Sequence, residues 1–68
     1  MGSPLQRLWE ALEAQGLNTE ERILVIAGLD HPLALQEMAD WVVDHPKATW
    51  QELMTEVGRL IKKYMINS

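Results

Sequence analysis

Two Asp-His-Pro tripeptides hold the only side chains of this sequence whose types could form a metal site. They are Asp30-His31-Pro32 and Asp44-His45-Pro46. Two imidazoles and two carboxylates are donors that zinc accepts. The tripeptides stand at opposite ends of one predicted helix, however, roughly 18 Å apart at a rise of 1.5 Å per residue. Helix capping and turn formation explain them better, so no metal ligand is predicted, although a metal bridge between subunits stays open.

Nucleophilic catalysis finds no support in the arrangement of the remaining polar residues. A nucleophile needs a base and an orienting group around a pocket. Ser3 and Ser68 stand at the chain ends, Thr19 and Thr49 fit helix caps, and the sequence has no cysteine. The acids all lie on predicted polar faces, where we expect no pKa shift. The sequence therefore predicts a non-enzymatic protein with no catalytic residue, no cofactor and no small-molecule substrate.

Composition indicates one small folded domain spanning residues 1–68, with residues 1–3 interpreted as in part a cloning remnant. Apolar residues make up 47% of the 68 positions and charged residues 24%, which is typical of globular chains. The net charge of −4 disfavours nucleic acid as a partner. The longest apolar run, residues 23–29, is far shorter than a membrane span. With no basic, apolar leader at the start and no cysteine, the expected location is the cytoplasm.

Helix-start signals divide the chain into four segments, predicted at residues 4–15, 19–28, 32–44 and 50–65. Each start has a capping residue with proline or glutamate following it at the preferred spacing. The caps are Ser3, Asn18, either Asp30 or His31, and Thr49. No segment alternates as a strand does. The predicted fold is a compact all-α domain of four helices.

The second segment contains a continuous apolar run that also suits a buried strand. Residues 23–26 are Ile-Leu-Val-Ile, rich in β-branched side chains. The Asn18/Glu21 capping box decides for a helix, since a strand would leave it unused. Because apolar residues surround this helix, it is predicted to be the central and most buried element.

The last segment has the clearest apolar pattern. Spacings of three and four join a central seam, and a flanking row widens it. The seam is Trp50, Leu53, Val57, Leu60 and Tyr64, and the flanking row is Met54, Ile61 and Met65. The charged residues from Glu52 to Lys63 are predicted to form a solvated face. Gly58 inside this helix costs about 1 kcal/mol relative to alanine, which either a close approach by another backbone or chance explains.

Two stretches are similar to known helical families. Residues 50–58 resemble the first helix and turn glycine of a helix-turn-helix motif, which implies DNA binding and requires a recognition helix after Gly58. Residues 35–60, with Trp41 before a Pro-Lys-Ala-Thr-Trp turn, resemble the later helices of death-fold adaptor domains. Those domains are six-helix bundles, whereas this chain has room for four helices, so membership is not inferred.

The apolar band of the last helix points to association with another protein. The band is wider than one neighbouring helix covers, and tryptophan and methionine are favoured anchors at interfaces. The predicted function is a non-enzymatic protein–protein interaction module, forming a homodimer through Trp41, Trp50, Met54, Ile61 and Met65. The alternatives are a small DNA-associated regulator that acts as a dimer, and a small inhibitor or adaptor of a larger protein.

Overall fold

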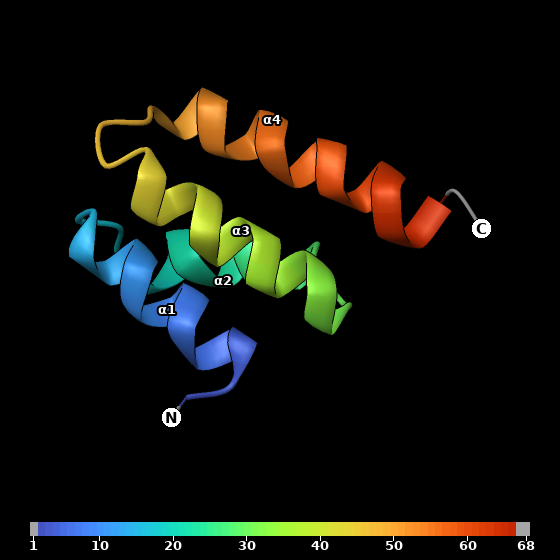
Figure 1. The fold of residues 1–68 in the computed structure, drawn as a ribbon. Helices are drawn as coiled ribbons and strands as arrows, with labels where there is room; N and C mark the ends of the chain where they lie inside the picture. Colours follow the sequence, from blue (N-terminus) through green and yellow to red (C-terminus); the bar gives the residue numbers. More distant parts are fainter. Residues whose placement is uncertain (1, 67–68) are drawn as a thin grey trace.

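The computed structural model describes residues 2–66, which form four α-helices (Figure 1). Their bounds are α1 (Pro4–Ala14), α2 (Thr19–Ala27), α3 (Pro32–Asp44) and α4 (Trp50–Ile61). A π-helical turn, η1 (Lys62–Ile66), continues α4. The predicted all-α fold with four helices is confirmed. None of the helices described in this range is long and apolar enough to cross a membrane.

Two helices begin with the capping boxes that the sequence predicts. At α2, the Asn18 side chain accepts a hydrogen bond from the Glu21 amide (2.8 Å), and the Glu21 carboxylate accepts one from the Asn18 amide (3.0 Å). Thr49 and Glu52 make the same reciprocal pair at α4, at 3.2 and 2.8 Å. These bonds satisfy amides that the first helical turn leaves free. The apolar run of residues 23–26 is accordingly helical.

The other two helices begin at prolines, whose missing N–H is no loss in a first turn. Ser3 caps α1, and its hydroxyl accepts from the Gln6 amide at 3.2 Å. His31, rather than Asp30, caps α3. After α1 ends, Gly16 has a φ of +91°, a backbone conformation that only glycine adopts without strain. Gly16 therefore stops the first helix, as predicted.

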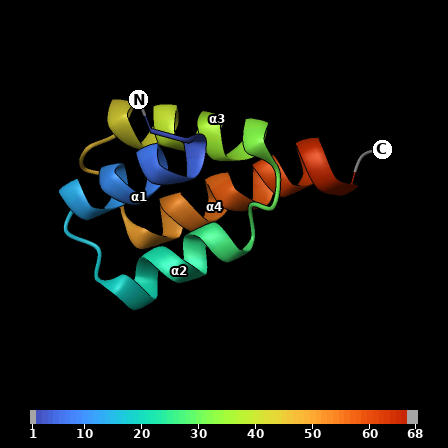
Figure 2. The same cartoon turned by 90° about the horizontal axis from the view of Figure 1, so that it is seen from below.

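The four helices form a ring in which each packs against two neighbours. α1 lies between α3 and α2, and α4 closes the ring by contacting both α3 and α2. α1 and α3 run in one direction, while α2 and α4 run in the other (Figure 2). Each helix turns an apolar stripe inward. The buried core is Leu8, Leu12, Val25, Leu29, Ala34, Met38, Ala39, Val42, Leu53, Val57 and Leu60.

The second helix, α2, buries fewer apolar side chains than α3. α3 buries Ala34, Met38, Ala39 and Val42, whereas the only apolar side chain that α2 buries is that of Val25. On α2, Ile23 and Leu24 are 53% and 61% exposed. The prediction that the second helix is the central element is therefore wrong. A nine-residue helix in contact with α1 and α4 turns its remaining side to solvent, whatever its composition.

A buried arginine joins α2 to α1. Arg22 is only 8% exposed, and its guanidinium carbon lies 4.1 Å from the centre of the Trp9 ring. One terminal nitrogen is 3.7 Å from the Glu13 carboxylate, and the other donates to the Thr19 hydroxyl at 3.4 Å. Its Nε is buried and has no hydrogen-bond partner among the described residues. We therefore expect stacking and packing to contribute more to stability than the charge of this side chain does.

Candidate functional site

The two Asp-His-Pro turns lie at opposite ends of α3, and their imidazoles serve the helix ends. His31 Nδ1 accepts a hydrogen bond from the Leu33 amide at 3.1 Å, and His45 Nδ1 lies 2.7 Å from the Trp41 carbonyl oxygen. Each ring also stacks on an aromatic neighbour. The ring centres of His31 and Tyr64 are 5.0 Å apart, and those of His45 and Trp41 are 4.2 Å apart. Within residues 2–66, no three His, Cys, Asp or Glu side chains gather as metal ligands do.

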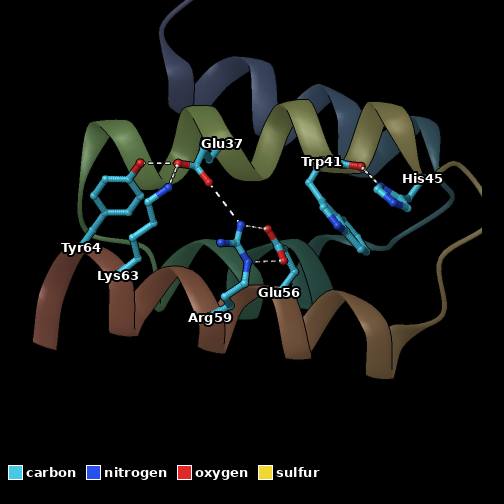
Figure 3. Close-up of polar contacts among 7 residues, drawn as sticks. All are labelled: Glu37, Trp41, His45, Glu56, Arg59, Lys63 and Tyr64. Carbon is cyan, nitrogen blue, oxygen red and sulfur yellow. Dashed lines mark hydrogen bonds and ion pairs between the residues drawn. The ribbon is translucent and has the colours of Figure 1, made fainter. Parts of the chain in front are cut away.

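Polar side chains gather instead around Glu37, which projects from α3 toward α4 (Figure 3). Lys63 Nζ lies 2.6 Å from one carboxylate oxygen, and the Tyr64 hydroxyl donates to the same oxygen. Arg59 approaches the other oxygen at 3.2 Å and also pairs with Glu56. We call these five residues the Glu37 network. Because its members come from α3, α4 and η1, it ties the last two helices together.

The Glu37 network shifts several pKa values. Hydrogen bonds from Lys63 and Tyr64 lower the pKa of Glu37 from 4.5 to about 2, with a smaller effect of Arg59. The carboxylate in turn raises the pKa values of Lys63 and Tyr64. At the start of α4, hydrogen bonds from the Thr49 backbone and hydroxyl lower the pKa of Glu52. The prediction that no acid has a shifted pKa is therefore wrong for Glu37 and Glu52.

We expect acid to destabilise the protein through Glu37. A carboxylate whose pKa is lower in the folded state stabilises the fold above its unfolded pKa. This contribution is lost as the pH falls from 4.5 toward 2. Glu37→Gln should lower Tm at neutral pH by a few degrees, and its Tm should approach that of the wild type near pH 2.

Thermal melts followed by circular dichroism over this pH interval measure the effect. The matched control is Glu20→Gln, which removes one negative charge from an exposed position on α2. It should keep the wild-type acid dependence. An equal loss of acid dependence in both variants would show that net charge, rather than the Glu37 network, is responsible.

Glu56 contradicts the prediction of a fully solvated charged face on α4. It is 7% exposed, and Arg59 donates to its two oxygens at 2.9 and 2.6 Å. The spacing of three residues that brings these two side chains together is readable from the sequence. The burial of Glu56 is not, because it depends on how closely α3 approaches α4.

A hollow of about 410 Å³ opens between the end of α3 and the start of α4. The Thr55 hydroxyl donates to the Gln51 carbonyl at 2.9 Å, and the His45 ring is engaged with Trp41 (Figure 3). Contacts with residues four positions earlier therefore hold both the His45 imidazole and the Thr55 hydroxyl. Its lining is Trp41, His45, Thr49, Gln51, Glu52, Thr55 and Glu56.

The predicted interface residues divide between two sides of α4. Trp50, Met54, Ile61 and Met65 follow one another at helical spacing, and we call them the α4 row. Trp50 is 40% exposed, and the other three are half-buried against the core. Trp41 belongs to α3 and lines the hollow between α3 and α4. The structure therefore brings four of the five together and sets Trp41 apart.

Two neighbours, rather than one, cover the apolar band of the last helix. α3 covers one side, and α2 covers part of the α4 row. The close approach is at Gly28, where a Cβ atom would lie 3.3 Å from the Ile61 side chain and 3.4 Å from that of Val57. Leu24 precedes Gly28 by one helical turn, so it lies on the side of α2 that borders α4. Leu24 is 61% exposed, which the sequence prediction missed by placing α2 in the core.

Gly58 marks neither a turn nor an approach by another element. It lies inside α4, and the helical chain continues through η1 to Ile66. The described residues after Gly58 thus contain no separate recognition helix of the kind that the helix-turn-helix resemblance requires. A Cβ atom at Gly58 would meet nothing within 4 Å in the described chain.

No protein-family model, curated protein or solved structure matches this chain. The function must accordingly be inferred from the surfaces that the residues themselves create.

Proposed function

We propose that this protein is a non-enzymatic association module that forms a homodimer by burying the α4 row. The observation that carries the proposal is the exposed border of this row. Trp50 at its start is 40% exposed, although it is large and apolar. Half-buried Met54, Ile61 and Met65 continue the row along α4 and η1. A second chain covering this surface removes apolar area from water, which stabilises association.

The residue types in the α4 row suit such an interface. Tryptophan and methionine are enriched at the centres of protein interfaces, where they form packed anchors. The small size of the chain limits the stability that its own core supplies. Trp41 contributes only if the interface extends around α4 to the hollow. The proposed location is the cytoplasm. Proteins of this reducing compartment rarely contain disulfides, and this chain has no cysteine.

The contacts of the basic residues favour a protein partner over DNA. Arg59 and Lys63, two of the three basic residues near the end of α4, are both paired with Glu37. These pairs reduce the positive charge available to phosphate groups. No observation favours the DNA-associated regulator, so it is not proposed further. An inhibitor or adaptor would use the same α4 row to bind a larger partner. This is the next hypothesis if the chain is a monomer in solution.

Sedimentation over a concentration series tests the homodimer. We expect a dimer at micromolar concentration, and a Tm that rises with concentration because association stabilises the folded chain by mass action. Trp50→Glu and Ile61→Glu place a charge in the proposed interface and should shift the mass toward the monomer, while the helical circular dichroism persists. A monomer at hundreds of micromolar, with a constant Tm, would contradict the proposal.

The matched control is Leu33→Glu, which introduces the same charge at an exposed leucine at the start of α3. It should leave the mass unchanged. Because Ile61 also touches the α2 side of the core, Trp50→Glu is the variant that separates loss of the interface from loss of the fold.

A further inference from the structure

The two histidines of the repeated Asp-His-Pro tripeptide have opposite hydrogen-bonding roles at the ends of α3. His31 Nδ1 lies 3.1 Å from the Leu33 amide. Because an amide only donates, this nitrogen carries no proton and presents its lone pair. His45 Nδ1 lies 2.7 Å from the Trp41 carbonyl oxygen, which only accepts, so here the same nitrogen carries the proton. The two neutral rings are therefore held in different tautomers.

Protonation of the rings affects these two hydrogen bonds differently. A charged imidazole carries a proton on each nitrogen. His31 then has no lone pair for the Leu33 amide, and α3 loses its N-terminal cap. His45 keeps the proton that it donates to Trp41 and gains another on Nε2, so its hydrogen bond remains. Since histidine ordinarily changes charge at about pH 6.5, weak acid is enough to separate the two ends of the helix.

The titratable groups around His31 come from its own turn, from η1 and from α3. Asp30 lines a hollow of about 330 Å³ together with His31. The Tyr64 ring stacks on the imidazole, and its hydroxyl donates to Glu37, which Lys63 also contacts. Among the described residues, those of α1 that line this hollow have no titratable side chain. The carboxylate of Asp30 and the face of Tyr64 attract a charged imidazole, which gives the protonated ring a place in the folded chain.

The charges that face His45 come from its own turn and from α4. Asp44 precedes it in the chain. Lys47 and Glu52 line a hollow of about 290 Å³ with it, and Glu56 lines the larger hollow. Hydrogen bonds within its capping box lower the pKa of Glu52 most, and the charge of His45 adds to this effect. A cation is also favourable beside the C-terminus of a helix. The end of α3 therefore accepts a charged His45 without losing a hydrogen bond.

We propose that His31 is a pH-responsive cap, which holds the start of α3 closed at neutral pH and releases the Leu33 amide when its ring is protonated. His45 stays bonded in both protonation states. Two tripeptides that are alike in sequence thus give the two ends of one helix different responses to weak acid. The inference goes beyond the proposed homodimer and does not depend on it, since every contact involved lies within one chain.

Nitrogen NMR of the two imidazoles tests the tautomers. The resonance of a ring nitrogen differs strongly between its protonated form and the form with a lone pair. At about pH 7.5, where ordinary histidines are neutral, we expect the proton of His31 on Nε2 and that of His45 on Nδ1. His45 serves as the control within the same spectrum. A proton on Nδ1 of His31 at this pH would contradict the proposal.

The Leu33 amide reports whether the cap opens. Between about pH 7.5 and about pH 5.5, its resonance should change with the same midpoint as the His31 ring. Its hydrogen exchange, relative to an unstructured peptide, should become about fivefold faster, the factor expected from the loss of one cap. An amide that stays protected while His31 is protonated would mean that another acceptor, such as Asp30, takes over the cap. That result would overturn the proposal.

His31→Asn keeps a cap at the start of α3 and removes its titration. Asparagine is a good N-cap whatever the pH, so the Leu33 amide should be equally protected at about pH 7.5 and about pH 5.5. The matched control, His45→Asn, removes the other titrating ring and should leave the wild-type response of Leu33 unchanged. A response that persists in His31→Asn, or that disappears in His45→Asn, would assign it to another group and contradict the proposal.

Discussion

Leu60→Ala should destabilise the protein by about 2–5 kcal/mol and leave a large fraction of the chain unfolded at 37 °C. Leu60 is fully buried in the core between the helices. Removing its side chain loses apolar burial and leaves a cavity that the packed surroundings fill only partly. A chain of this size rarely has more than roughly 3–5 kcal/mol of stability. Urea unfolding at one fixed protein concentration measures the loss, because dimerisation also contributes.

Leu33→Ala is the matched control for this substitution. Leu33 is 54% exposed near the start of α3, and alanine is a slightly better helix former. Its effect should stay within about 0.5 kcal/mol. Similar losses in the two variants would mean that α4 does not pack into the core as described.

Arg22→Ala should lower the free energy of unfolding by about 2 kcal/mol, although Arg22 is a charged residue. The side chain is almost entirely buried between α1 and α2, with its guanidinium on the Trp9 ring. Alanine removes both the stacking and the apolar stem that fills this crossing. Urea unfolding measures the loss, and the fluorescence of Trp9 should change because its ring becomes more exposed.

Arg22→Met separates the packing of this side chain from its charge. Methionine keeps a long flexible stem and removes the buried Nε that lacks a partner, so its cost should be less than about 1 kcal/mol. Arg7→Ala, which breaks an exposed 2.8 Å ion pair with Asp40, should change stability by about 0.5 kcal/mol or less. Equal losses for Arg22→Met and Arg22→Ala would instead assign the contribution of this side chain to its charge.

The helix boundaries could be predicted from the sequence because the forces that set them are local. Asn18 with Glu21, and Thr49 with Glu52, form hydrogen bonds across three residues, so their spacing in the chain is enough to identify them. Gly16 likewise needs only its own backbone conformation. The sequence does not decide between His31 and Asp30 as the cap of α3, since both residue types can accept a hydrogen bond from the helix amides.

The inward seam of α4 was also readable from the sequence, whereas the side that each neighbour covers was not. Leu53, Val57 and Leu60 are buried as their spacing indicates. The exposure of Leu24 and the burial of Glu56 depend on the angles and distances between helices, and no local pattern encodes these. The same holds for Glu37, whose partners stand 22 to 27 residues later in the chain.

The amino-acid sequence by itself thus determined four helices, the residue at which each begins and the seam that α4 turns inward, because capping and periodicity act within a few residues. Only the tertiary structure decided that α2 is not the central helix and that it leaves Leu24 exposed. It also decided that Gly58 faces open space. These features follow from how helices distant in sequence pack against one another, and packing depends on the shape of the whole chain.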